Sequence, residues 1–207
     1  MPGADQDPGA PVLPSLQADC ASCAALCCVG LALDRGAAFA IDKPAGVPCP
    51  NLDGHDCGIH ADLSARGFSG CVRFDCAGAG QRTIALFDGA SWRDDPDLLA
   101  PMLDTFRHLR RLHEVLGLLA AAETLPLTDR DEATRRDLIA ALCPPRMRVA
   151  RATALATGPL PTRVEGFLRG LRSRVQPLRE AADRPTSCQK PPDRRPPCPS
   201  PQARSRR

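Results

Sequence analysis

The residues of this chain that could do chemistry are concentrated near its N-terminal end. Eight of its 11 cysteines are Cys20, Cys23, Cys27, Cys28, Cys49, Cys57, Cys71 and Cys76. Thiolates bind zinc and iron–sulfur clusters, and such sites draw their cysteines from short, regular spacings. The order C-x2-C-x3-C-C, C-P-x-L, C-x-I-H and C-x4-C therefore predicts two or more sets of metal ligands.

Disulfide bonds are the alternative use of so many cysteines. Residues 1–14 are acidic and rich in Pro and Gly, and they lack the basic and apolar regions of a secretory signal. The longest apolar stretch, residues 21–33, is shorter than the roughly 20 residues of a membrane span. We therefore expect a cytoplasmic protein whose cysteines stay reduced. Arg outnumbers Lys 25 to 2, which suggests a GC-rich bacterial genome.

The spacing of the first four cysteines limits which of them can share an ion. In one straight helix Cys20 and Cys27 would lie about 10 Å apart, whereas thiolates on one zinc lie within about 4 Å of each other. We therefore place Cys20 and Cys23 in a turn before a helix that contains Cys27 and Cys28. Adjacent helical side chains diverge by about 100°, so Cys27 and Cys28 are not expected to serve one ion together. Either two centres share this segment, or one of the pair is a buried thiol without metal.

Eight thiolates suit two four-cysteine zinc sites or two iron–sulfur clusters. His60, in Cys57-Gly-Ile-His60, could replace one thiolate, and the alternative is a surface histidine. Filled thiolate sites keep negative charge, so cations should lie nearby. The local candidates are Lys43, Arg66, Arg73 and Arg82.

Composition and periodicity divide the chain into five segments. We expect a disordered leader (1–17), a cysteine-cluster domain (18–90), a helical hairpin (91–143), a basic helical segment (144–183) and a disordered Pro/Arg-rich tail (184–207). Short strands are expected at 38–41, 72–74 and 83–87. The predicted fold class is a small irregular α+β domain stabilised by metal, followed by a mainly α-helical region and a disordered basic tail.

Start and stop signals predict three helices. The first is expected over 95–122, because Asp95 can cap it and an apolar stripe follows at helical spacing. The second is expected over 128–143, with Thr128 as its cap and two prolines behind it. The third is expected over 161–176, before Pro177 interrupts it.

Other reactive residues are assigned no chemistry. His108 and His113 are five positions apart, point away from each other on a helix, and are expected at the surface. Cys143 ends the second helix and is expected to be a small buried apolar residue. Cys188 and Cys198 lie in the tail and are excluded from the cluster.

Charge is distributed unevenly along the chain. Residues 144–207 carry 15 basic and 4 acidic side chains, while the preceding residues are net acidic. Nucleic acid is one partner for such a segment. Only one aromatic residue, Phe167, is available there for stacking on bases.

The order C-x2-C-x3-C-C, C-P-N-L, C-G-I-H, G-F-S-G-C and a final Cys76 resembles the zinc- or iron-chelating cysteine-cluster family (YkgJ-type). The resemblance covers residues 18–77 and implies metal binding, and one branch of the family resembles flagellin lysine methylases. Residues 39–46 and 75–81 are also similar to the N-terminal region of actinobacterial pentapeptide-repeat proteins, although the repeats are missing. The loop between Cys23 and the Cys-Cys doublet is one residue longer than the family pattern.

Three functions follow from these features. We prefer an intracellular metal-binding protein, with zinc or iron, in which the metal stabilises a small fold and the partner is another protein. The alternative is an enzyme, either an iron–sulfur oxidoreductase or an accessory to protein methylation. The second alternative is a zinc-finger-like nucleic-acid binder that uses the basic tail. No small-molecule substrate is evident, and no membrane partner is expected.

Overall fold

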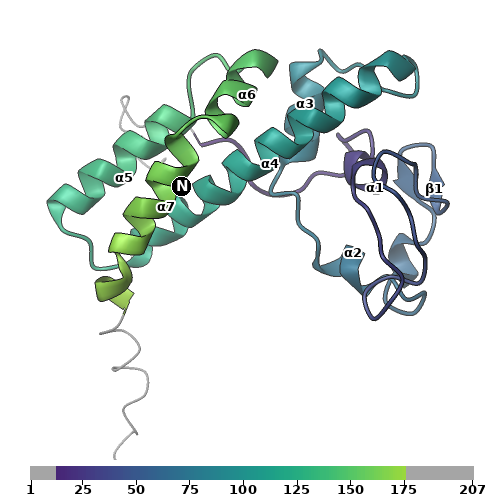
Figure 1. Cartoon of the computed structure of the whole chain (residues 1–207), viewed down its shortest axis with the longest axis horizontal. Coiled ribbons are helices and arrows are strands. Elements are labelled where there is room, and N and C mark those ends of the chain that lie inside the picture. Colours follow the sequence, from purple (N-terminus) through teal and green to yellow (C-terminus); the bar gives the residue numbers. More distant parts are fainter. Residues whose placement is uncertain (1–12, 176–207) are drawn as a thin grey trace, which may run out of the picture.

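The computed structural model describes residues 13–175, which are mainly helical. Figure 1 shows one long helix, α4 (Leu99–Ala121), crossing the molecule, with the cysteine-rich segment at one end and the last three helices at the other. The remaining helices are α1 (Leu26–Gly30), α2 (Ser69–Arg73), α3 (Ala79–Leu86), α5 (Asp129–Leu142), α6 (Val149–Thr157) and α7 (Leu160–Gly170). Short 3-10 turns occur at His60–Asp62, Pro96–Leu98 and Ala122–Thr124.

The helices expected over 95–122 and 128–143 are confirmed. The Asp95 side chain accepts a hydrogen bond from the backbone N–H of Asp97, 3.1 Å away, and α4 follows the short 3-10 turn. Thr128 and Asp131 cap the start of α5 reciprocally, each side chain accepting from the other residue's backbone N–H. These caps satisfy amide groups that a helix start leaves without partners.

The third helix differs from its expected bounds, and a fourth was missed. Helix α7 begins at Leu160 and ends at Gly170, and residues 172–175 return to helix after a turn. Helix α6 precedes it, separated by Gly158 and Pro159. Helix α6 is nine residues long and has no side-chain cap at its start, so the sequence lacks the start signal that marks α5.

The three expected strands are wrong. Residues 72–74 lie in and just after α2, residues 83–87 lie in and just after α3, and residues 38–41 form bends beside an isolated bridge between Leu33 and Lys43. Packing explains α3, because Ile84, Leu86 and Phe87 lie against the α4 core and this contact overrides local strand propensity. The one sheet in the described part is a two-stranded hairpin of β1 (Leu52–Asp53) and β2 (Asp56–Cys57), turning at Gly54 with φ 56°.

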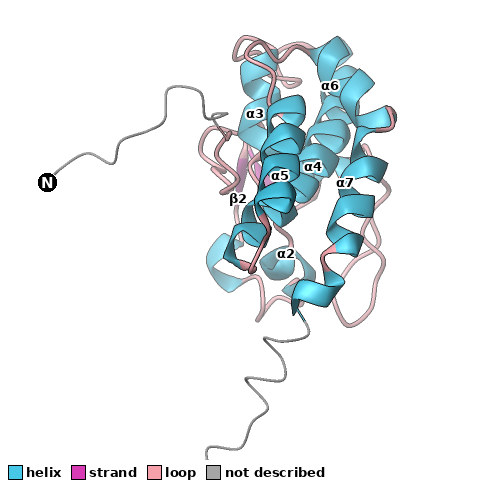
Figure 2. Ribbon diagram, turned by 90° about the vertical axis from the view of Figure 1, so that its left-hand side faces the viewer, coloured by secondary structure: helices cyan, strands magenta, loops and turns pink. Residues whose placement is uncertain are grey.

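Two apolar clusters are built along α4. The first joins Leu26 and Val29 of α1 to Met102, Phe106 and Leu109, and it ties the cysteine-rich segment to the long helix. The second lies among α4, α5, α6 and α7, which are drawn side by side in Figure 2. Each fully buried side chain of this kind stabilises the fold by about 2 kcal/mol.

The loops between α1 and α2 have much less core. Their own cluster contains three buried residues, Leu33, Leu63 and Phe68. The expected architecture, a small irregular unit followed by a mainly helical region, is thus confirmed in outline. Residues 13–17, assigned to the leader, are placed against the helices through Leu16. The tail expected over 184–207 lies outside the described residues.

No helix in the described part of the chain combines the length and the apolar character needed to cross a membrane.

Candidate metal centre

The first cysteines occupy a turn and a short helix, as their spacing predicts. The backbone N–H of Cys23 donates to the carbonyl of Cys20 over 3.2 Å, which closes the turn. Ala25 then adopts a left-handed conformation with φ 54°, and α1 begins at Leu26 with Cys27 and Cys28 in its first turn. The turn therefore brings the first two thiols back toward the start of α1.

Cys27 and Cys28 are closer than their positions on a helix suggest. Their sulfur atoms lie 3.9 Å apart, within the distance that two thiolates on one zinc require. This distance would also suit a shared ion, so the expectation that Cys27 and Cys28 do not serve one ion together stays a prediction. The hydrogen bond with Cys28 and then burial raise the pKa of Cys27 well above its usual range, so Cys27 is protonated while no metal is bound.

Cys27 belongs to a neighbourhood that we call the first thiol group: Cys20, Cys23, Cys27 and Cys76. Burial, followed by the charges of Cys27 and Cys76, raises the pKa of Cys20. Burial raises the pKa of Cys23 to about 11, and the charges of the same two cysteines contribute. Thiols that influence each other in this way lie close enough for their charges to interact.

Gly80 makes room for the first thiol group. A Cβ at this position would lie 2.6 Å from the sulfur of Cys23 and 3.9 Å from that of Cys76. The Cys23 sulfur therefore occupies the space that a Cβ would need, and the Cys76 sulfur lies at ordinary contact distance beside it. Sequence reasoning did not single out Gly80, because its role depends on Cys23, more than 50 positions earlier in the chain.

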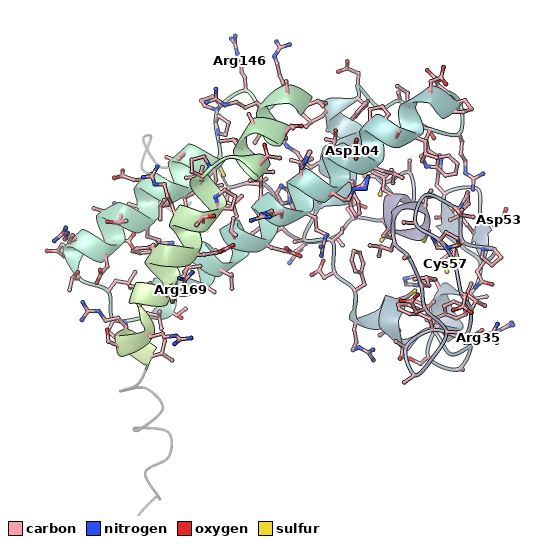
Figure 3. All side chains as sticks on the ribbon, viewed as in Figure 1. Arg35, Asp53, Cys57, Asp104, Arg146 and Arg169 are labelled. Carbon is pink, nitrogen blue, oxygen red and sulfur yellow. The ribbon has the colours of Figure 1, made fainter. Side chains whose placement is uncertain are left out.

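The other four cysteines form the second thiol group: Cys28, Cys49, Cys57 and Cys71. The backbone N–H of Cys49 donates to the carbonyl of Cys28 over 3.0 Å. Burial and then the charges of Cys49, Cys27 and Cys57 raise the pKa of Cys71. Figure 3 shows Cys57 at the cysteine-rich end of the molecule, remote from Arg146 and Arg169.

Charge interactions divide the eight predicted ligands into two neighbourhoods, with Cys27 of the first also acting on Cys71 of the second, and the described residues form no finished metal site. Within residues 13–175, no three His, Cys, Asp or Glu side chains are grouped so that they could hold one ion. The nine cysteines of this part are free thiols. His60, the predicted substitute ligand, is exposed at the start of a 3-10 turn. The donor chemistry thus fits zinc or iron, and binding would require the sulfurs to close on the ion.

One of the four candidate cations lies at the thiols. Lys43 is buried. Burial lowers its pKa, and negative charge on Cys49 and Cys28 acts in the opposite direction. Arg66 and Arg73 are exposed. Arg82 acts elsewhere, because its charge influences His113 and Cys143.

The prediction that His113 is a surface residue is wrong. Its side chain is buried, and Nδ1 lies 2.6 Å from the carbonyl oxygen of Ala77. Burial lowers the pKa of His113, so the neutral ring donates its Nδ1–H to this carbonyl and ties α4 to the residue after Cys76. The sequence could have indicated that His113 is buried, because it lies three residues before Leu116 and four after Leu109 in the apolar stripe.

His108 and Cys143 are half-buried. The Nδ1 atom of His108 lies 3.2 Å from the Thr153 hydroxyl, so this histidine packs between α4 and α6 instead of standing free at the surface. Cys143 caps the end of α5 against the second apolar cluster, and burial raises its pKa to about 11. This agrees with its expected role as a small apolar residue.

Comparison with known proteins gives one informative match. The chain is similar to the "Uncharacterized protein YybG" of Bacillus subtilis (strain 168), with 41% identity over 114 residues. The match covers 54% of this chain and 41% of the relative, so the chain spans less than half of that relative's length. No family model and no solved structure matches the chain.

Proposed function

We propose that this chain is a cytoplasmic metal-binding protein whose two thiol groups hold zinc or iron in a structural role. The observation that supports this proposal is the set of charge interactions that links the eight free thiols, together with the 3.9 Å separation of the Cys27 and Cys28 sulfurs. The two groups share this pair as their meeting point, which favours two adjoining centres over one. The resemblance to zinc- or iron-chelating cysteine-cluster proteins supports the same function.

The small apolar core of the loops between α1 and α2 explains why a bound metal would stabilise them. The loops between α1 and α2 bury only three apolar residues of their own, and small units of this kind commonly depend on a metal for stability. Metal binding to such a unit is coupled to its folding, because the ligands have no fixed positions before the ion arrives. In this proposal the sulfurs close on the ion, and the stabilised unit and helical region together form the surface that a partner protein contacts.

Metal analysis after anaerobic purification tests the proposal. We expect tightly bound zinc or iron, lowered in the Cys20→Ser and Cys49→Ser variants, one from each thiol group. Cys143→Ser and Cys188→Ser are the controls and should keep their metal; Cys188 lies outside the described residues. A freshly isolated protein without tightly bound metal, or equal losses in all four variants, contradicts the proposal.

The same preparation separates a structural centre from a redox enzyme. A colourless protein with stoichiometric zinc supports the structural role. Visible absorption with acid-labile sulfide instead supports an iron–sulfur oxidoreductase or a methylation accessory, since iron–sulfur clusters absorb visible light and contain inorganic sulfide.

A polyanion binder is the second candidate, and the exposed arginines of the last helices favour it. Within residues 144–175, six exposed arginines form no ion pair: Arg146, Arg148, Arg151, Arg163, Arg169 and Arg172. Arginines of this kind bind phosphate through charge, and that binding weakens steeply with salt. Affinity for DNA or RNA that falls with salt and disappears when residues 144–207 are deleted would support this function, and its absence would exclude it.

A further inference from the structure

Lys43 is a buried lysine whose amino group is held by three backbone carbonyls. Its side chain is only 3% exposed. The Nζ atom donates to the carbonyl oxygens of Val29, Pro44 and Val47 at 3.2, 3.0 and 2.8 Å. Three acceptors use three hydrogens, and only the ammonium form has three. These three acceptors match the three N–H groups of an ammonium.

This charge has no carboxylate partner in the part of the chain that the structure describes. The ion pairs found among residues 13–175 do not include Lys43, and the adjacent Asp42 is paired with Arg35 at an exposed position. Burying an unpaired charge is unfavourable, and an opposite charge nearby reduces that penalty. Burial lowers the pKa of Lys43, and negative charge on Cys49 and Cys28 opposes this effect.

Lys43 also fixes the loop that carries Cys49. Its ammonium contacts the carbonyl of Val29 near the end of α1, and the backbone N–H of Gly46 donates to the same carbonyl over 2.9 Å. The N–H of Cys49 then reaches the carbonyl of Cys28. These bonds satisfy carbonyls that a helix end leaves free, and together they hold residues 43–49 against α1.

We propose that Lys43 positions the second thiol group and balances its charge. Its ammonium would favour a metal centre with net negative charge at this group. The inference rests on the proposed metal-binding function. A divalent ion held by four thiolates carries two net negative charges, and a buried ammonium stabilises that state. The first thiol group has no equivalent buried cation among the described residues, so the two groups should differ in affinity.

The test replaces Lys43 and measures each centre separately. Wild type, Lys43→Met and Lys43→Arg are purified with metal, stripped and titrated with Co²⁺, and the sulfur-to-cobalt charge-transfer absorption is followed. Removing an opposite charge beside an acidic group shifts its equilibrium by at least about tenfold. We therefore expect Lys43→Met to weaken one of two Co²⁺ sites at least about tenfold and to shift its absorption band.

The charge-conserving variant and a surface control make the result specific. Lys43→Arg should recover part of the lost affinity, because it restores the charge without the same fit. Arg66→Met removes an exposed cation of the same unit and should change nothing. Alkylation with iodoacetamide, followed by peptide mass spectrometry, should show Cys49, Cys57 and Cys71 exposed in Lys43→Met while Cys20, Cys23 and Cys76 stay protected.

The possible failures are distinguishable. A wild-type protein that binds no Co²⁺, Zn²⁺ or iron contradicts the proposed function itself. A wild-type protein with two metal sites, together with a Lys43→Met variant of unchanged affinity and spectrum, overturns the inference about Lys43 alone. Equal losses in Lys43→Met and Lys43→Arg also overturn it, because they show that charge is not responsible. Loss of both sites in Lys43→Met, with the helical region folded by circular dichroism, overturns the assignment to one group.

Discussion

The sulfur atoms of Cys27 and Cys28 lie 3.9 Å apart at the junction of the two thiol groups. Cys27 interacts with Cys20 and Cys23, while the carbonyl of Cys28 accepts a hydrogen bond from the N–H of Cys49. One turn of α1 thus contributes a thiol to each group. A short helix with two adjacent cysteines can therefore contribute one ligand to each of two neighbouring centres.

Exchanging one member of this pair should expose one group only. In Cys27→Ser we expect Cys20, Cys23 and Cys76 to become reactive toward iodoacetamide, with about half of the metal lost. In Cys28→Ser the reactive thiols should be Cys49, Cys57 and Cys71. Peptide mass spectrometry after alkylation of the metal-loaded protein measures both patterns.

Cys143→Ser is the control for this pair, since Cys143 packs in the second apolar cluster away from both groups. If Cys27→Ser and Cys28→Ser expose the same set of thiols, the eight cysteines act as one centre and the division into two groups is wrong.

Gly80→Ala should weaken the first centre without unfolding the helices. The added methyl group would lie 2.6 Å from the sulfur of Cys23, so this sulfur must leave its present position. Alanine itself favours a helix over glycine by about 1 kcal/mol, which offsets part of the strain. We expect a lower metal content with a melting temperature close to that of wild type, measured on the same preparation.

Gly166→Ala is the matched control, because Gly166 also lies within a helix and a Cβ there would meet no atom within 4 Å. It should keep its full metal content and gain up to about 1 kcal/mol of stability. Normal metal binding by Gly80→Ala would show that Cys23 is not held against this glycine.

The sequence predicts the long helices well, because their signals are local. A cap such as Asp95 or Thr128 and an apolar stripe are properties of a few neighbouring residues. The strand predictions near Val72 and Ile84 were wrong, because these residues belong to α2 and α3, whose formation depends on contacts with distant residues. Phe74 lies beneath the guanidinium of Arg110, and α3 packs along α4. No local pattern contains those partners.

The candidate site was predictable in its residue types but not in its arrangement. Cysteine spacing identifies the eight thiols and the turn before α1. It does not reveal that Cys76 returns to Cys23 across Gly80, since more than 50 positions separate these cysteines in the chain. Nor does it separate buried Lys43 from exposed Arg66. Charge and burial of single residues are set by the tertiary fold.

Chelation should loosen the cysteine-rich unit while the helical region persists. The unit's own cluster holds Leu33, Leu63 and Phe68, whereas α4, α5, α6 and α7 share a larger apolar core that contains none of the eight cysteines. With a strong chelator we expect trypsin to cut after Arg35 and Arg66 within residues 18–90. Arg107, exposed in the middle of α4, should stay resistant.

Circular dichroism and thermal melting provide the second measurement for chelation. Most of the helical signal should survive, with a lower first melting transition. Unchanged digestion and an unchanged melting curve after complete metal removal would mean that the metal does not stabilise the unit.

Protonation of Glu132 at low pH should lower the free energy of unfolding of the helical region. Its carboxylate accepts hydrogen bonds at 2.7 and 2.9 Å from Arg135, whose side chain is buried, and another at 2.8 Å from Arg136. The Arg135 hydrogen bonds are the chief reason that the pKa of Glu132 falls from 4.5 to about 2. Because the folded state binds this proton less readily than the unfolded state, the contribution is complete above about pH 4.5 and is lost as the pH falls toward 2.

Glu132→Gln should therefore remove this pH dependence. It should also lower the free energy of unfolding at pH 7 by about 2 kcal/mol, the usual value of hydrogen bonds to a charged group. Urea unfolding between pH 2 and 7, with chelator present in every sample, measures the difference from wild type without the pH dependence of metal binding. Glu165→Gln is the control, because Glu165 is about half exposed and lies 3.9 Å from Arg111, and exposed pairs contribute at most about 1 kcal/mol. A wild-type curve parallel to that of Glu132→Gln across this range would show that Arg135 does not depend on Glu132, and that its bond to the carbonyl of Leu119 suffices to hold the buried guanidinium.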